Sequence, residues 1–158
     1  MTKLLGSLTV TGLAAVALVC TMGGRRASAS SGQSGQLHIV KDCSAYTRLA
    51  GGFCTIVTSN LAEIPKGSVV HYTQAFGILN PGWLDSNVVL DAGNGNKAAG
   101  RCTVDFTIAT PGVCTFQDGT GQLAGFTARV AVGTTPTPPA EFTWDGTYSF
   151  QNPGQNQN

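Results

Sequence analysis

Large apolar and polar residues alternate along two segments near the end of this chain, 126–132 and 141–150. One face of the first segment carries Phe126, Ala128, Val130 and Val132, and one face of the second carries Phe142, Trp144, Tyr148 and Phe150. Between these residues lie mainly threonines, a serine, Arg129 and Asp145. A period of two is typical of antiparallel strands with one buried face. The pattern therefore predicts an all-β chain whose apolar face is covered.

Extended along the chain, the same pattern predicts eight strands separated by turns rich in Gly, Pro and Asn. The predicted strands are 37–42, 53–58, 67–75, 86–91, 100–107, 113–117, 122–132 and 141–150. No stretch after residue 30 has a helical period, although 60–64 fits one short turn. Eight strands in a single small domain indicate an antiparallel barrel or a sandwich.

The apolar faces also predict which side chains lie inside. The interior set, expected to line a cavity or to fill the barrel, is Val104, Phe106, Phe116, Phe126, Val130, Trp144 and Tyr148. Asp105, Arg129 and Asp145 are expected outside. An eight-stranded interior is either packed by side chains or holds one small ligand, and packing is the favoured reading. Since no charged residue shares the apolar face of a clearly alternating strand, we expect a charge-poor interior.

The first 29 residues have the three parts of a secretory signal. Lys3 precedes an apolar stretch from Leu4 to about Cys20, and the small triplet 27–29 follows. Cleavage after Ala29 and export are favoured, while a lipid-modified Cys20 and a retained membrane anchor remain as alternatives. We therefore expect a secreted protein without membrane association after cleavage. Its parts are a signal peptide (1–29), a flexible leader (30–36), a barrel domain (37–150) and a flexible tail (151–158).

Charge narrows the range of partners. The full chain has a formal net charge of +1, but removal of residues 1–29 leaves 6 Lys and Arg against 8 Asp and Glu. No basic stripe remains, so nucleic acid is not an expected partner. The sequence has no Cys-x-x-Cys, and His38 and His71 lack ligand spacing, so neither a metal nor a cofactor is expected.

Four cysteines follow the signal segment: Cys43, Cys54, Cys102 and Cys114. An even number in an exported chain indicates two disulfides, with three possible pairings. The short separations favour the local pairs Cys43–Cys54 and Cys102–Cys114. Cys102 and Cys114 share the apolar face of neighbouring strands, and their pairing requires a hairpin loop centred near Ile108.

By residue type, His71 and Tyr72 are the acid–base candidates. A histidine titrates near neutral pH, and a tyrosine donates a hydrogen bond or a proton. Because the two are adjacent on a strand, only one of them faces the interior. No Ser-His-Asp set can be argued from the sequence.

Several motifs resemble the allene oxide cyclase barrel-like proteins, relatives of plant allene oxide cyclases and dirigent proteins. The matching segments are Ser-Asn-Leu at 59–61, Ile-Pro-Lys-Gly-Ser at 64–68, Leu-Asp-Ser-Asn-Val-Val-Leu at 84–90, Asp-Gly-Thr-Gly at 118–121 with Ala-Gly-Phe at 124–126, and Trp-Asp-Gly-Thr-Tyr at 144–148. The resemblance implies an eight-stranded antiparallel barrel, an apolar cavity in the active relatives and frequent trimers.

For function, two hypotheses follow. The resemblance implies a cofactor-independent cyclase or isomerase that steers an apolar small molecule inside the barrel. The plant cyclases use an acidic side chain from the first strand, whereas the only acid of that strand here is Asp42, at its end. The alternative is a non-catalytic exported module that binds an apolar ligand or a surface, and the expected charge-poor interior favours it.

Overall fold

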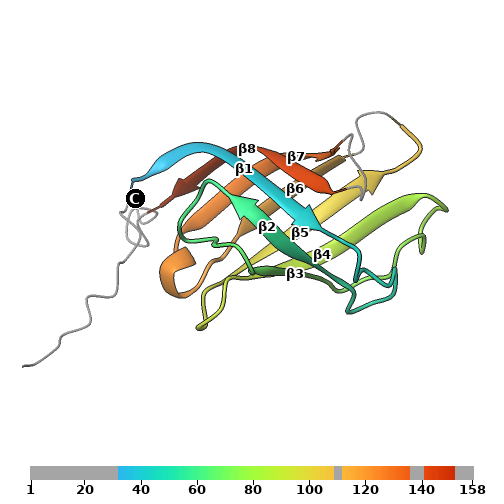
Figure 1. Ribbon diagram of the computed structural model, residues 1–158, viewed down its shortest axis with the longest axis horizontal. Helices are drawn as coiled ribbons and strands as arrows, with labels where there is room; N and C mark the ends of the chain where they lie inside the picture. The colour runs from blue at the N-terminus through green and yellow to red at the C-terminus, as the bar shows by residue number, and fades with distance from the viewer. Residues whose placement is uncertain (1–31, 109–111, 136–140, 152–158) are drawn as a thin grey trace, which may run out of the picture.

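The computed structural model describes residues 32–108, 112–135 and 141–151, and these form a closed antiparallel barrel of eight strands (Figure 1). The strands are β1 (Ser34–Asp42), β2 (Phe53–Ser59), β3 (Val69–Tyr72), β4 (Trp83–Asp91), β5 (Lys97–Asp105), β6 (Gly112–Gln117), β7 (Phe126–Thr134) and β8 (Phe142–Phe150). Each strand pairs with the next along the chain, and β8 pairs with β1 to close the barrel. The predicted fold class is confirmed.

Strand boundaries differ from the prediction at several places. Ser34–Gln36, expected in a flexible leader, belong to β1 and pair with β8. Residues 122–125, expected in a strand, form the end of a short 3₁₀ helix, Gly121–Leu123, and a turn. Gly125, the last residue of this turn, has a φ of 75°, which lies outside the extended region, so β7 begins only at Phe126. The predicted signal peptide, and all but the first residue of the predicted tail, lie outside the described residues.

Both predicted disulfides are present, Cys43–Cys54 and Cys102–Cys114. Cys102 and Cys114 are directly opposite each other in the β5–β6 pairing. That register centres the connection near Ile108, as expected. Because each bridge joins neighbouring strands or their ends, it restrains the loop at one end of the barrel.

Aromatic side chains fill a large part of the interior. Trp144 and Phe126 are fully buried, and the ring of Phe116 lies 5.1 Å from the Trp144 ring and 6.4 Å from the Phe126 ring, between centroids. Phe150 extends this packing, with its ring 5.4 Å from that of Phe126. This part of the barrel is a packed core rather than a ligand chamber.

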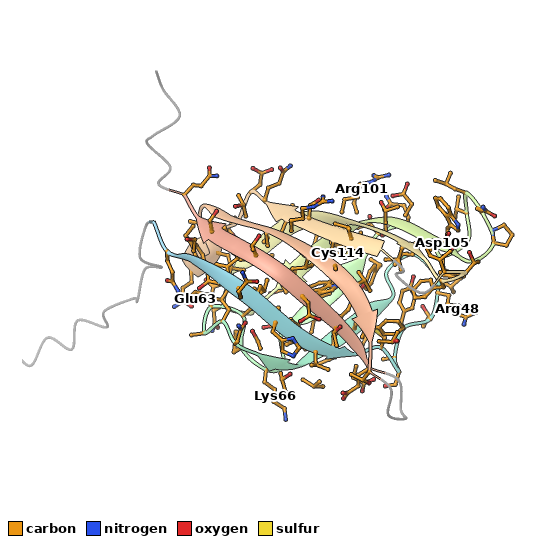
Figure 2. All side chains as sticks on the ribbon, turned by 90° about the horizontal axis from the view of Figure 1, so that it is seen from above. Arg48, Glu63, Lys66, Arg101, Asp105 and Cys114 are labelled. Carbon is orange, nitrogen blue, oxygen red and sulfur yellow. A yellow bond between two sulfur atoms is a disulfide. The ribbon has the colours of Figure 1, made fainter. Side chains whose placement is uncertain are left out.

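The two ends of the barrel differ in polarity. One end is formed by the connections β1–β2, β3–β4, β5–β6 and β7–β8. In Figure 2 this end is marked by Arg48 and Asp105, and the other end by Glu63. Every exposed large hydrophobic residue of the described chain lies at the first end, which we call the apolar end. These residues, which we call the apolar rim, are Leu49, Phe53, Ile78, Leu79, Phe106 and Ile108.

Candidate functional site

A cavity of about 40 Å³ lies at the apolar end, and Phe106 is the residue of the apolar rim that lines it. A space of this size holds roughly three water-sized groups. Its walls are apolar except for Lys41, Tyr46 and Tyr72, and cysteines of both disulfides contribute to them. The cavity therefore combines a small apolar chamber with a few polar groups, as ligand sites usually do.

Lys41 is the unexpected member of this site. It lies near the end of β1 on the same face as Leu37 and Ile39, and its side chain is only 3 % exposed. Its Nζ donates a hydrogen bond to Tyr72 Oη at 2.6 Å and lies 4.1 Å from the centroid of the Trp144 ring. Lys41 is the one charged residue buried in the described part of the chain, and its place inside the barrel was not predicted.

No carboxylate forms an ion pair with Lys41 in the described part of the chain, where Lys97 pairs with Asp91, Arg101 pairs with Asp85 and His38 contacts Asp145. Burial without an opposite charge lowers the pKa of Lys41 from 10.5 to about 7. The face of the Trp144 ring attracts an ammonium ion and acts in the opposite direction. Near neutral pH, the amine is therefore available in its neutral form.

Tyr72 supplies the proton-bearing partner. Burial raises its pKa, and the neighbouring Tyr46 adds to the shift, so its hydroxyl stays protonated. When Lys41 is charged, the ammonium donates to the phenol oxygen. When Lys41 is neutral, the phenol can donate to its nitrogen. The pair can thus hold or pass one proton inside an apolar chamber.

Two further donors lie around this pair. Tyr46, whose ring centroid is 5.1 Å from that of Tyr72, has a buried hydroxyl, and Trp144 has a buried indole N–H. Neither atom has a hydrogen-bond partner among the described residues. Because leaving a buried donor unpaired costs about 1–3 kcal/mol, the Tyr46 hydroxyl in the cavity wall favours a ligand that brings a hydrogen-bond acceptor.

The two acid–base candidates are separated by the strand, as their adjacency predicts. His71 is exposed on the outside of β3, with its ring 6.0 Å from that of Phe53. Tyr72 faces the interior and lines the cavity. His71 therefore takes no part in the cavity.

Of the seven residues expected inside, two line this cavity, Val104 and Phe106. Four others are buried in the barrel but do not line it: Phe116, Phe126, Val130 and Trp144. Tyr148 is half-buried, and its hydroxyl accepts a hydrogen bond from Gln33 Nε2.

Phe106 lines the cavity as predicted, but it lies at the cavity mouth rather than deep in the barrel, because the residue is 42 % exposed. The strand ends one residue earlier, where the Asp105 carboxylate accepts hydrogen bonds from the backbone N–H and the hydroxyl of Thr107. This local turn carries Phe106 out of the strand register. Its ring lies at the cavity mouth, between the rings of Phe76 and Phe142.

Lys41 was missed, although the sequence contained a pattern that could have found it. Leu37, Ile39 and Lys41 have the same parity, so an unbroken β1 places all three on one face. A lysine at the end of a strand is ordinarily read as solvent-exposed.

In the described ranges, no helix is long and apolar enough to cross a membrane, and no three His, Cys, Asp or Glu side chains gather as metal ligands. Comparison of the chain with models of known protein families, with curated proteins and with solved structures finds no match. The resemblance to the allene oxide cyclase barrel-like proteins stays a prediction.

Proposed function

We propose that this protein is an exported barrel that binds a small, largely apolar molecule at its apolar end. The observation that carries the proposal is a cavity at the apolar end, with Lys41 and Tyr72 in its wall and Phe106 of the apolar rim at its mouth. The cavity accepts a polar group and a few heavy atoms, and the rest of the molecule lies against the rim. Apolar surface gathered at one place is a common mark of a binding site.

Export is part of the same proposal. Its support is the signal pattern in residues 1–29 together with two disulfides in a small domain.

A second function, cofactor-independent cyclisation or isomerisation of the bound molecule, is favoured by the Lys41–Tyr72 pair. A neutral amine beside a protonated phenol can accept and return a proton, and the chamber restricts the conformation of its guest. The resemblance to the cyclase family supports this candidate, and the same family makes a trimer an expected form.

The binding proposal can be tested with hexan-1-ol, which has one polar group and a short apolar chain. Amide resonances in NMR spectra of the oxidised protein should shift around the cavity and the rim. Those of the opposite end, at 60–68, 92–96 and 118–125, should not.

Matched variants sharpen the test. Phe106→Ser removes apolar contact at the cavity mouth, and about 1 kcal/mol of lost contact weakens binding roughly fivefold. Val89→Ser makes the same kind of change on the outer face of β4 and should leave the affinity unchanged. Equal affinities in the two variants, or shifts spread over both ends, would refute the proposal.

A further inference from the structure

We propose that the ligand carries an aldehyde or ketone group, and that Lys41 forms a reversible imine with its carbonyl carbon. This inference rests on the proposed function, because the carbonyl compound must first bind at the apolar end. It adds the chemical class of the ligand and the atom that reacts.

The surroundings of Lys41 favour a carbonyl group. Lys41 lines a chamber whose other polar side chains, Tyr46 and Tyr72, both carry hydroxyl donors. The Tyr46 hydroxyl is buried without a partner among the described residues, so a carbonyl oxygen would supply the missing acceptor. A carboxylate ligand would instead form an ion pair with the ammonium and hold the amine in its unreactive form.

The amine is also suited to nucleophilic attack. Neutral lysine is the nucleophile in imine formation, and a lysine becomes neutral when it is desolvated in an apolar pocket. Lys41 is buried, has no carboxylate partner in the described chain and has a pKa lowered to about 7. Lys66 and Lys97, in contrast, are exposed on the surface.

The step needs no further reactant. The lone pair of Lys41 Nζ forms a bond to the carbonyl carbon, and the π electrons of the C=O bond move to oxygen, which takes the proton of the Tyr72 hydroxyl. Nitrogen returns a proton to Tyr72, and the resulting carbinolamine loses its hydroxyl with a second proton as water. Amine and carbonyl thus give imine and water: one hydrogen of the water comes from Tyr72, which regains a hydrogen from nitrogen, and the other comes directly from nitrogen.

The size of the cavity limits the reacting part of the ligand. About 40 Å³ accepts the carbonyl group and one or two carbons, so a straight chain has to continue outward over the rim. A short unbranched aldehyde fits this description, whereas a carbonyl group flanked by two bulky substituents does not.

Reductive trapping tests the inference. The oxidised protein is incubated with hexanal and cyanoborohydride at neutral pH, and peptide mapping locates the hexyl groups. We expect Lys41 to be modified at least about 10-fold faster than the exposed Lys66 and Lys97. Lys41→Arg should abolish the fast modification, and Lys66→Arg should leave it intact. Tyr72→Phe should slow the trapping at Lys41, because it removes the hydroxyl that protonates the carbonyl oxygen.

The two proposals fail in different ways. If hexan-1-ol and hexanal shift the cavity resonances but Lys41 is not trapped faster than the exposed lysines, the imine is refuted and the binding function stands. If neither compound shifts those resonances and the hexyl groups follow amine exposure alone, both proposals are refuted.

Discussion

Replacing Lys41 by methionine should stabilise the protein and remove a specific dependence of its stability on pH. Methionine has nearly the length of the lysine stem and carries no charge, so it can occupy the same apolar space. The parent chain, in contrast, must either bury an ammonium ion or release its proton on folding, and both are unfavourable below the ordinary pKa of lysine.

The magnitude follows from the two pKa values. Lys41 titrates at 10.5 when unfolded and at about 7 when folded, so between these values the unfolded chain binds more protons. The free energy of unfolding of the parent should therefore rise with pH, by roughly 1.4 kcal/mol per unit from about pH 7 to about pH 10. Below pH 7 the destabilisation is complete, at about 5 kcal/mol, and this is an upper bound because the Trp144 face favours the ammonium.

Two other groups contribute near the top of this window. Burial raises the pKa of Tyr72 on β3 and of Tyr46 in the β1–β2 connection, so near pH 10 the folded chain keeps protons that the unfolded chain loses. The parent and Lys41→Met both carry these tyrosines, so the comparison between them isolates Lys41. The four cysteines of the barrel are in disulfides and do not titrate.

The assay is urea unfolding of the oxidised protein at several pH values from 6 to 10. The stability of Lys41→Met relative to the parent should be greatest at pH 6–7 and vanish near pH 10. Lys66→Met, which changes an exposed lysine, should follow the profile of the parent. A constant difference between Lys41→Met and the parent would refute the reasoning, since it would mean that Lys41 keeps the same proton in both states.

Three further predictions test the fold and export. Trp144→Ala should cost ~3–5 kcal/mol in urea unfolding, because the indole is fully buried. Asp145→Ala, on the exposed face, should change stability by no more than ~0.5 kcal/mol. The reverse order would mean that the faces are inverted. Peptide mapping without reduction should find only local cross-links, and a peptide joining 43–54 to 102–114 would contradict the strand order. The mass of the protein recovered outside cells should correspond to a chain that begins at Ser30 and is four hydrogens lighter than its reduced form; two free thiols after denaturation would exclude two bridges.

The fold could be predicted because its information is local. All eight strands follow from a period of two and from turn residues, and the disulfide pairs follow from short separations and a shared face. The predicted strand boundaries were less accurate where a side-chain hydrogen bond to the backbone ends the strand. At Phe106, a hydrogen bond from Thr107 to Asp105 ends the strand earlier than the apolar pattern indicates.

The candidate site was largely hidden from the sequence because it depends on closure of the barrel. Lys41 comes from β1, Tyr72 from β3 and Trp144 from β8, and only the closed sheet brings their side chains together. The β1–β2 register also shifts between Val40 and Lys41, which alternation on one strand does not reveal. The apolar residues in the loops did not indicate the site either. Single exposed hydrophobic residues are common, and only their gathering at one end of the barrel, which the sequence does not show, is informative.

The position of Lys41 separates a structural explanation of the cavity from a functional one. Elsewhere, large side chains such as Trp144 and Phe126 fill the barrel, so this fold can close its interior without a charge. A Leu or Met at position 41 would extend that packing without the cost of burying an amine. The chain instead carries an ionisable group where it destabilises the barrel, beside a phenol and in the wall of the cavity at the apolar end. Groups that lower stability in this way are concentrated at sites of binding and catalysis, so Lys41, rather than His71, is the residue on which functional experiments should begin.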